Sequence, residues 1–204
     1  MGYEFARRYG IEGAYENYLQ RYYEDVHQWQ NRSDFRYSAS FFYNLSPKTA
    51  VFAQYRNTAA RYDGQNDGDD GWNSNNSQDY KLSDYFLGAR FKPGEKLSGE
   101  IKVGYGQKNF NNRFDKDGFA YTDGGTWIAE SRLDYQMQER TLLSLNFQRG
   151  YKSSPFAESA SYLDTLIGLE LRQKLLAERL ALNIGVDFET NEYSNENRNF
   201  PDRK

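Results

Sequence analysis

Cysteine is absent from this sequence, so no disulfide framework and no thiolate metal site can form. A single histidine, His27, lies in a polar run without a second histidine or cysteine, so we expect it on the surface rather than on a metal. The net charge of −3 is too small to indicate nucleic-acid binding. We find no Ser-His-Asp set, no phosphate-binding glycine loop and no zinc-ligand spacing. These absences predict a protein that is not an enzyme and has no metal, cofactor or nucleic-acid partner.

Long apolar runs are also missing. No stretch of roughly 18 apolar residues occurs, which excludes a transmembrane helix. Residues 1–10 lack the apolar centre of a signal peptide, which fits either a cytoplasmic chain or a mature segment. The mean hydropathy of −0.97 is low for a domain with a large core, yet aromatic residues make up 17% of the chain. A chain of 204 residues is long enough for one large domain or two small ones.

Strict alternation of apolar and polar residues is the main pattern in the chain. Leu97, Ile101 and Val103 alternate with Glu100 and Lys102, as in a β-strand with one apolar and one polar face. The same alternation recurs in seven further segments: 35–43, 51–55, 85–91, 127–137, 143–147, 163–171 and 180–188. The aromatic segments YEFARRY and AYENYLQRYYED predict about two more strands, on a weaker pattern. The sequence therefore predicts an all-β, antiparallel, up-and-down barrel with about 8–10 strands in this chain.

One segment also fits a helix. TLIGLELRQKLLAERLAL is rich in strong helix-forming residues. Its apolar positions nevertheless keep a period of two on both sides of KLLAER. We therefore assign it to a β-hairpin.

The connections between the expected strands alternate in length. NLSPKT, KPGEK, QER and KLLAER are short, whereas the links at 62–79, 107–125 and 148–161 are long and polar. Short turns at one end and long loops at the other are typical of outer-membrane β-barrels. A soluble sandwich or barrel would show the same alternation within its strands but has no reason to sort its loops in this way. The sorting favours apolar side chains that face lipid.

This interpretation assigns a side of the sheet to each strand residue. The expected lumen-facing polar residues are Arg56, Arg90, Glu100, Lys102, Glu130, Arg132, Asp134, Asn146, Glu170, Arg172, Asn183 and Asp187. The expected lipid-facing residues are Leu97, Ile101, Val103, Leu133, Leu145, Ile167, Leu169, Leu182, Ile184 and Val186. Aromatic residues near the ends of the apolar faces predict a girdle at the lipid headgroups; they are Tyr43, Tyr55, Tyr85, Phe91, Tyr105, Trp127, Tyr135 and Phe188. We expect Glu130, Arg132 and Asp134 to form ion pairs across the lumen rather than a catalytic cluster.

Several hairpins resemble one known family. FFYNLSPKTAVFAQYRNT, YKLSDYFLGARFKPGEKLSGEIKVGYGQKNF, TWIAESRLDYQMQERTLLSLNFQRGYKSS and SYLDTLIGLELRQKLLAERLALNIGVDFETNEY are similar to the β-barrel porin family of Gram-negative exopolysaccharide clusters. The likeness covers most of the chain beyond about residue 34. It implies an outer-membrane location, contact with outer-membrane lipid and a role in passing surface polysaccharide. It carries over no catalytic residue.

The ends depart from this family, whose barrels usually close with an aromatic-terminated strand. This chain ends in the polar RNFPDRK, and the strand at 178–190 finishes at the long-loop end. If YGIEG is a short turn, the N-terminal strand begins at that end too. We expect residues 1–204 to form one barrel domain or a segment of one, with the weakest pattern in 1–33. Unpaired strand edges are costly in lipid, so we expect further strands from the rest of the polypeptide or a partner chain.

Three functions remain open on these grounds. The first is a porin-like conduit linked to polysaccharide export, and the second is a structural or partner-binding barrel without transport. The third is a soluble carbohydrate-binding β-domain. The loop segment DGQNDGDDG carries part of a calcium-loop pattern at Asp63, Gln65, Asp67 and Gly68, but Ser74 stands where a bidentate glutamate is needed. A solvated loop explains it better.

Overall fold

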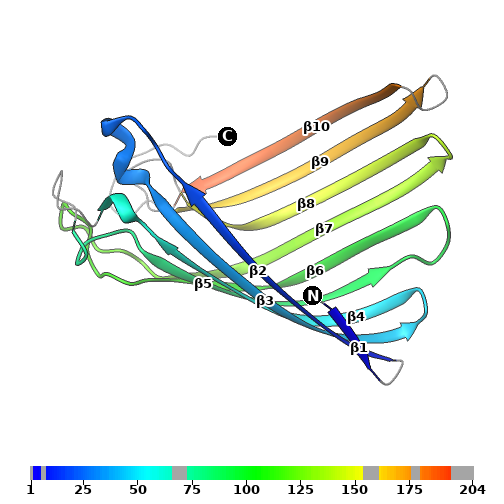
Figure 1. Ribbon diagram of the computed structural model, residues 1–204, viewed down its shortest axis with the longest axis horizontal. Coiled ribbons are helices and arrows are strands. Elements are labelled where there is room, and N and C mark those ends of the chain that lie inside the picture. Colours follow the sequence, from blue (N-terminus) through cyan, green and yellow to red (C-terminus); the bar gives the residue numbers. More distant parts are fainter. Residues whose placement is uncertain (1, 6–7, 66–72, 154–160, 176–179, 194–204) are drawn as a thin grey trace.

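The computed structural model describes residues 2–5, 8–65, 73–153, 161–175 and 180–193, without the side chains of 3–5, 25 and 26. These residues form one antiparallel sheet (Figure 1). Its strands are β1 (Gly2–Phe5), β2 (Tyr9–Gln20), β3 (Arg32–Ser46), β4 (Thr49–Arg61), β5 (Tyr80–Phe91), β6 (Leu97–Phe110), β7 (Gly124–Gln138), β8 (Thr141–Ser153), β9 (Ser161–Leu175) and β10 (Leu180–Tyr193). Two short 3-10 helices, η1 (Asp25–Gln30) and η2 (Asp63–Gln65), lie in loops. No helix in the described ranges is long and apolar enough to cross a membrane.

The strands follow one another in chain order, each paired antiparallel with the next. The sheet therefore has a turn end, where residues 47–48, 92–96 and 139–140 join neighbouring strands, and a loop end, where the long links lie. This confirms the predicted up-and-down meander and the alternation of short and long links. The segment with helix-forming residues is a β-hairpin as expected, since β9 and β10 pair from Leu175 and Leu180 onward.

Two expectations about strand limits were wrong. YGIEG is not a turn, because residues 9–13 begin β2 and pair with β3. The chain instead reverses before Tyr9, and β1 pairs with the first four residues of β2. Residues 107–110, 124–125 and 148–153 belong to strands rather than to loops. Most of these residues are polar or glycine, so the sequence gives no sign of the strand there, because hydrophobic alternation fades where a strand passes beyond its apolar stretch.

Each face of the sheet has its own chemistry, set by the register. Residues directly opposite each other on paired strands point to the same side. Phe41, Ala53, Leu87, Val103 and Ala129 are opposed in succession from β3 to β7, on the apolar face. On the other face, at the adjacent positions, the row is mixed rather than aliphatic throughout: Ser40, Gln54, Phe86, Gly104 and Ile128.

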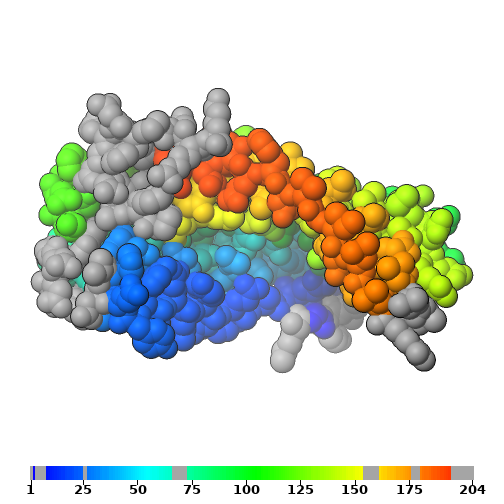
Figure 2. Space-filling model, turned by 90° about the horizontal axis from the view of Figure 1, so that it is seen from above, coloured from blue at the N-terminus to red at the C-terminus, as the bar shows by residue number. Residues whose placement is uncertain are grey.

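The sheet is curved but not closed. Figure 2 shows β2 along one rim and β10 along the other, with the central strands visible between them. In the described residues, β10 pairs only with β9, and β2 pairs with β1 only from Tyr9 to Glu12. The polar face is concave, since the cavities of the structure lie on it. The apolar face is convex and exposed.

Aromatic rings pave part of the concave face. Phe42, Phe52 and Phe86 are buried there, and the rings of Phe42 and Phe52 lie 5.0 Å apart. Gly104, opposite Phe86, allows the backbones of β5 and β6 to approach closely. A Cβ atom added at Gly104 would meet the backbone oxygen of Tyr85, so only glycine fits this position without a shift of the backbone.

Candidate functional site

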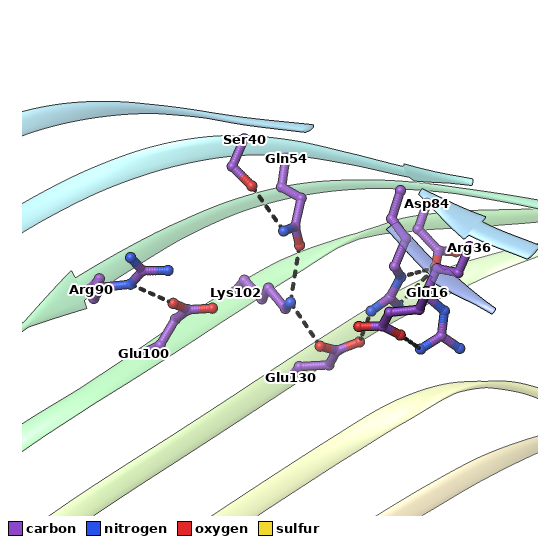
Figure 3. A network of polar contacts seen from close by, with 10 residues as sticks. Glu16, Arg36, Ser40, Gln54, Asp84, Arg90, Glu100, Lys102 and Glu130 are labelled. Carbon is purple, nitrogen blue, oxygen red and sulfur yellow. Dashed lines mark hydrogen bonds and ion pairs between the residues drawn. The ribbon is translucent and has the colours of Figure 1, made fainter. Parts of the chain in front are cut away.

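Lys102, on β6, lies at the centre of a polar network on the concave face (Figure 3). Its Nζ atom is 2.8 Å from Glu130 Oε2 and donates a hydrogen bond of 3.0 Å to Gln54 Oε1. Gln54 Nε2 in turn donates to Ser40 Oγ at 2.9 Å. The Lys102 ammonium also lies 4.8 Å from the ring centre of Phe86. Lys102 on β6 therefore joins β7 to β4 directly and to β3 through Gln54. Its contact with the Phe86 ring adds β5.

Arg56 extends this network toward the loop end. Its guanidinium lies between two carboxylates, 2.7 Å from Glu130 Oε1 and 2.8 Å from Asp84 Oδ2. It also stacks over the Phe86 ring at 4.9 Å. Glu130 therefore accepts charge-assisted contacts from both Arg56 and Lys102, which makes it the shared acid of the network.

A second network lies nearer the turn end. Arg90 contacts Glu12 Oε1 and Glu100 Oε2, each at 2.8 Å, so it ties β2 to β5 and β6. Its guanidinium lies 4.6 Å from the ring centre of Phe42. Arg132 contacts Asp134 at 3.4 Å, and its side chain is 68% exposed to the hollow of the sheet. Cations and acids alternate across the strands, so the concave face is strongly charged locally but nearly neutral in sum.

Two cavities open on this face. One of about 720 Å³ lies at the turn end and is lined by charged and apolar side chains, among them Glu12, Phe42 and Arg90. The other, of about 420 Å³, lies at mid-sheet and is lined by Arg56, Lys102 and other polar residues. Both are open troughs lined by mixed charges, suited to water and polar solutes rather than to a single apolar ligand.

The structure brings eight of the twelve expected lumen residues into these contacts or cavities. They are Arg56, Arg90, Glu100, Lys102, Glu130, Arg132 and Asp134, together with Asn146, which lines the mid-sheet cavity. The other four lie on the same face by register but away from the networks; they are Glu170, Arg172, Asn183 and Asp187. Of the trio expected to form ion pairs across the lumen, Glu130 pairs with Arg56 and Lys102 of strands β4 and β6, whereas Arg132 pairs with Asp134 of its own strand.

The expected lipid-facing residues all lie on the convex face. Leu97, Ile101, Val103, Leu145, Ile167, Leu169, Leu182, Ile184 and Val186 are exposed there, and Leu133 is half-buried. Four girdle residues are direct neighbours across β4 to β7, in the order Tyr55, Tyr85, Tyr105 and Trp127. Tyr43, Phe91 and Tyr135 lie toward the turn end, whereas Phe188 faces Ile167 within the apolar surface. Whether these residues meet lipid stays a prediction.

Several residues of the networks were missed by sequence reasoning. Gln54 and Asp84 stand at polar positions of the alternation, which was a usable signal. Phe42, Phe52 and Phe86 stand at the same inward positions, where an aromatic ring breaks the apolar-out, polar-in pattern. Phe42 lies beneath Arg90, and Phe86 lies beneath Arg56 and Lys102. These contacts depend on neighbours from other strands, so periodicity within one strand cannot show them.

The loop with the partial calcium pattern offers no metal site in its described part. Asp63 is 2.8 Å from Arg21 Nη2, and Gln65 is hydrogen-bonded to Gln78. Asp67 and Gly68 lie outside the described residues. Across the described ranges no group of three or more histidine, cysteine or acidic side chains is placed to hold a metal ion. His27 is exposed on η1, with its ring 5.9 Å from that of Tyr22.

A curved antiparallel sheet with a charged concave face and an apolar convex face has the architecture of a β-barrel wall. Residues 25–204 match the model of a family described as "Putative beta-barrel porin 2". Because this match spans most of the chain, the protein belongs to that family. No curated protein matches the sequence, and no solved structure matches it either. The family is described as one of porins rather than of enzymes.

Proposed function

We propose that this chain forms part of the wall of an outer-membrane β-barrel that acts as a porin-like conduit. The observation that carries the proposal is the inverted distribution of polarity. Leucine, isoleucine, valine and aromatic side chains are exposed across the convex face from β2 to β10. Soluble proteins rarely expose a continuous apolar surface of this extent. Lipid around the barrel and water inside it would satisfy both faces.

The concave face suits a water-filled path. The charges of Lys102, Arg56 and Glu130 are paired with one another, so the wall would present strong local fields without a large net charge. Such a lining suits the passage of polar and neutral solutes, and it would not select strongly for ions of one sign of charge. We infer that small ions of both signs pass with similar ease.

The cargo is proposed to be a surface or exported polysaccharide. Support for this comes from the resemblance of the hairpins to the exopolysaccharide-linked porins and from the mixed charged and amide lining at mid-sheet. Polysaccharides are rich in hydroxyl groups, which exchange hydrogen bonds readily with such side chains. A structural or partner-binding barrel without transport is the second candidate.

Reconstitution separates these functions. We expect the protein in its membrane assembly to extract only with detergent and to form channels in planar bilayers, with weak ion selectivity and current blocks when oligosaccharide is added. Channels without blocks would retain the conduit and reject the polysaccharide. An inserted assembly without conductance would favour the structural or partner-binding barrel. A stable, monodisperse protein in plain buffer would reject the membrane location.

A further inference from the structure

Residues 62–65 and 73–79, the described parts of the link between β4 and β5, pack against the concave face at the loop end. Tyr62, directly after β4, is 2% exposed and packs in a buried apolar cluster with Ala60, Tyr80 and Leu82. The strand members of this cluster are even-numbered residues of β4 and β5, so they share the concave face with Arg56. The described part of the loop at Tyr62 therefore covers the concave face.

Both stems of this segment are tied together by buried hydrogen bonds. Gln65 is fully buried; its Oε1 accepts a bond of 2.7 Å from the backbone N–H of Gln78, and its Nε2 donates to Gln78 Oε1 at 3.2 Å. The backbone N–H of Tyr62 donates to Asp79 Oδ1 at 2.7 Å. Burial raises the pKa of the Asp79 carboxyl. Side chains buried and paired in this way indicate a built structure rather than a solvated loop.

Neighbouring loops hold the same segment from both sides. Asn112, in the loop after β6, donates hydrogen bonds to the backbone oxygen and the hydroxyl of Ser77 at 3.0 and 2.9 Å. The Tyr121 hydroxyl donates to the backbone oxygen of Asn76 at 3.0 Å. From the loop before β3, the backbone oxygen of Asn31 accepts a bond of 3.3 Å from Gly64. We define residues 62–65 and 73–79 together with these three anchoring residues as the cap.

Lys108 lies beneath the cap in an unfavourable position. It is 2% exposed, and its ammonium has no hydrogen-bond partner in the described residues. The Nζ atom lies 3.8 Å from the ring centre of Tyr80 and 4.6 Å from that of Phe110. Cation–π attraction offsets part of the cost of burying the charge, but water would solvate it better. Opening the cap would hydrate this ammonium, so Lys108 favours the open state.

The buried side chains beneath the cap make contacts across the concave face. The Tyr80 hydroxyl is 2.6 Å from Ser153 Oγ on β8, three strands away, and the Arg32 guanidinium on β3 lies 5.9 Å from the Tyr62 ring centre. At the turn end, by contrast, the same concave face holds the cavity of about 720 Å³. We propose that the cap closes the loop end of the conduit over β3 to β8 and that passage requires the cap to move. Lys108 sets how easily it opens. This inference rests on the proposed conduit.

Two substitutions with opposite expected effects test the cap. Tyr62→Ala removes the buried ring that packs against Ala60, Tyr80 and Leu82. Lys108→Met replaces the buried ammonium by an unbranched apolar side chain of similar length. Amide hydrogen exchange reports local opening of the structure. In the complete membrane assembly, we expect the exchange of residues 77–79, measured by mass spectrometry, to become at least about tenfold faster in Tyr62→Ala. Exchange should become slower in Lys108→Met. Tyr23→Ala is the matched control, because this loop tyrosine is 96% exposed.

Channel recordings then connect the cap to passage. Tyr62→Ala should raise the open probability and admit larger solutes, Lys108→Met should lower the open probability, and Tyr23→Ala should leave both unchanged. Unchanged exchange at 77–79 in both cap variants, with a folded assembly by gel mobility, would overturn the cap. Altered exchange with unaltered channel activity would show a cap that does not close the path. If no variant conducts while exchange changes as expected, the conduit itself is rejected and the cap remains as a fold feature only.

Discussion

At the scale of single residues, the cations and carboxylates of the concave face neutralise one another in pairs. Glu130 accepts from Arg56 and Lys102, and each of these cations lies over the Phe86 ring. From the sequence alone, Lys102→Ala would be expected to cost little, because a lumen-facing lysine should be solvated. The structure revises this expectation. Lys102 is 9% exposed and bridges Glu130 to Gln54.

Lys102→Ala tests this revision. Removal of the ammonium leaves Gln54 and one Glu130 oxygen without their partner, so we expect a loss of about 1–3 kcal/mol in the free energy of unfolding. Arg132→Ala is the control, since its exposed ion pair contributes at most about 1 kcal/mol. Urea titration of the refolded protein in lipid vesicles measures both. Equal effects of the two substitutions would show that Lys102 is solvated after all.

At the scale of the element, each strand is a two-sided ribbon whose two faces meet different surroundings. In β6, Ile101 and Val103 are exposed on the convex face while Lys102 is buried on the other. The band of Tyr55, Tyr85, Tyr105 and Trp127 crosses four strands on the loop-end side of the apolar surface. This is where interfacial rings would mark the headgroup level in the proposed membrane orientation.

Ile101→Arg tests the direction in which β6 faces. A charge placed on the lipid face near the bilayer midplane should cost about 2–4 kcal/mol of unfolding free energy in vesicles, whereas a rim position costs about 0–1. Gln107→Arg is the matched control, because Gln107 is exposed on the same face of β6 nearer the loop end. Similar costs at the two positions would contradict a membrane-facing convex surface. Spin labels at Ile101 and Lys102 provide a second check through their accessibility to dissolved oxygen.

At the scale of the whole molecule, the direction of the edge strands limits how the barrel closes. Both β2 and β10 run from the turn end to the loop end. Neighbours in an antiparallel barrel run in opposite directions, so these two strands cannot pair directly. An odd number of strands must therefore stand between β2 and β10. β1 occupies the position next to β2, but it pairs only with Tyr9 to Glu12. Unpaired backbone groups would each cost several kcal/mol in hydrocarbon.

We therefore predict that β10 pairs in the membrane with a strand that runs from the loop end to the turn end. β1 runs in this direction but has only four residues, so we predict that this strand comes from outside residues 1–204 or from a partner chain. Amide hydrogen exchange of residues 182–189 should be as slow in the assembly as that of the central strand β6, and faster when residues 1–204 are studied alone in detergent. A high-resolution structure of the assembly gives the direct answer. A barrel closed by residues 1–204 alone, with β1 hydrogen-bonded to β10, would refute the prediction.

The amino-acid sequence by itself determined the strands, their antiparallel order and the two faces, because side-chain alternation and turn length are local properties. It misplaced the first turn and the loop limits, where polar strand ends such as residues 148–153 carry no hydrophobic signal. Only the tertiary structure decided which charges pair, because Arg56 meets Asp84 and Glu130 through the register of separate strands. The cap is likewise a tertiary feature. Tyr62, Gln65 and Lys108 are polar or isolated in the sequence, and they become buried only because curvature brings β3, β5 and β8 together beneath the loops.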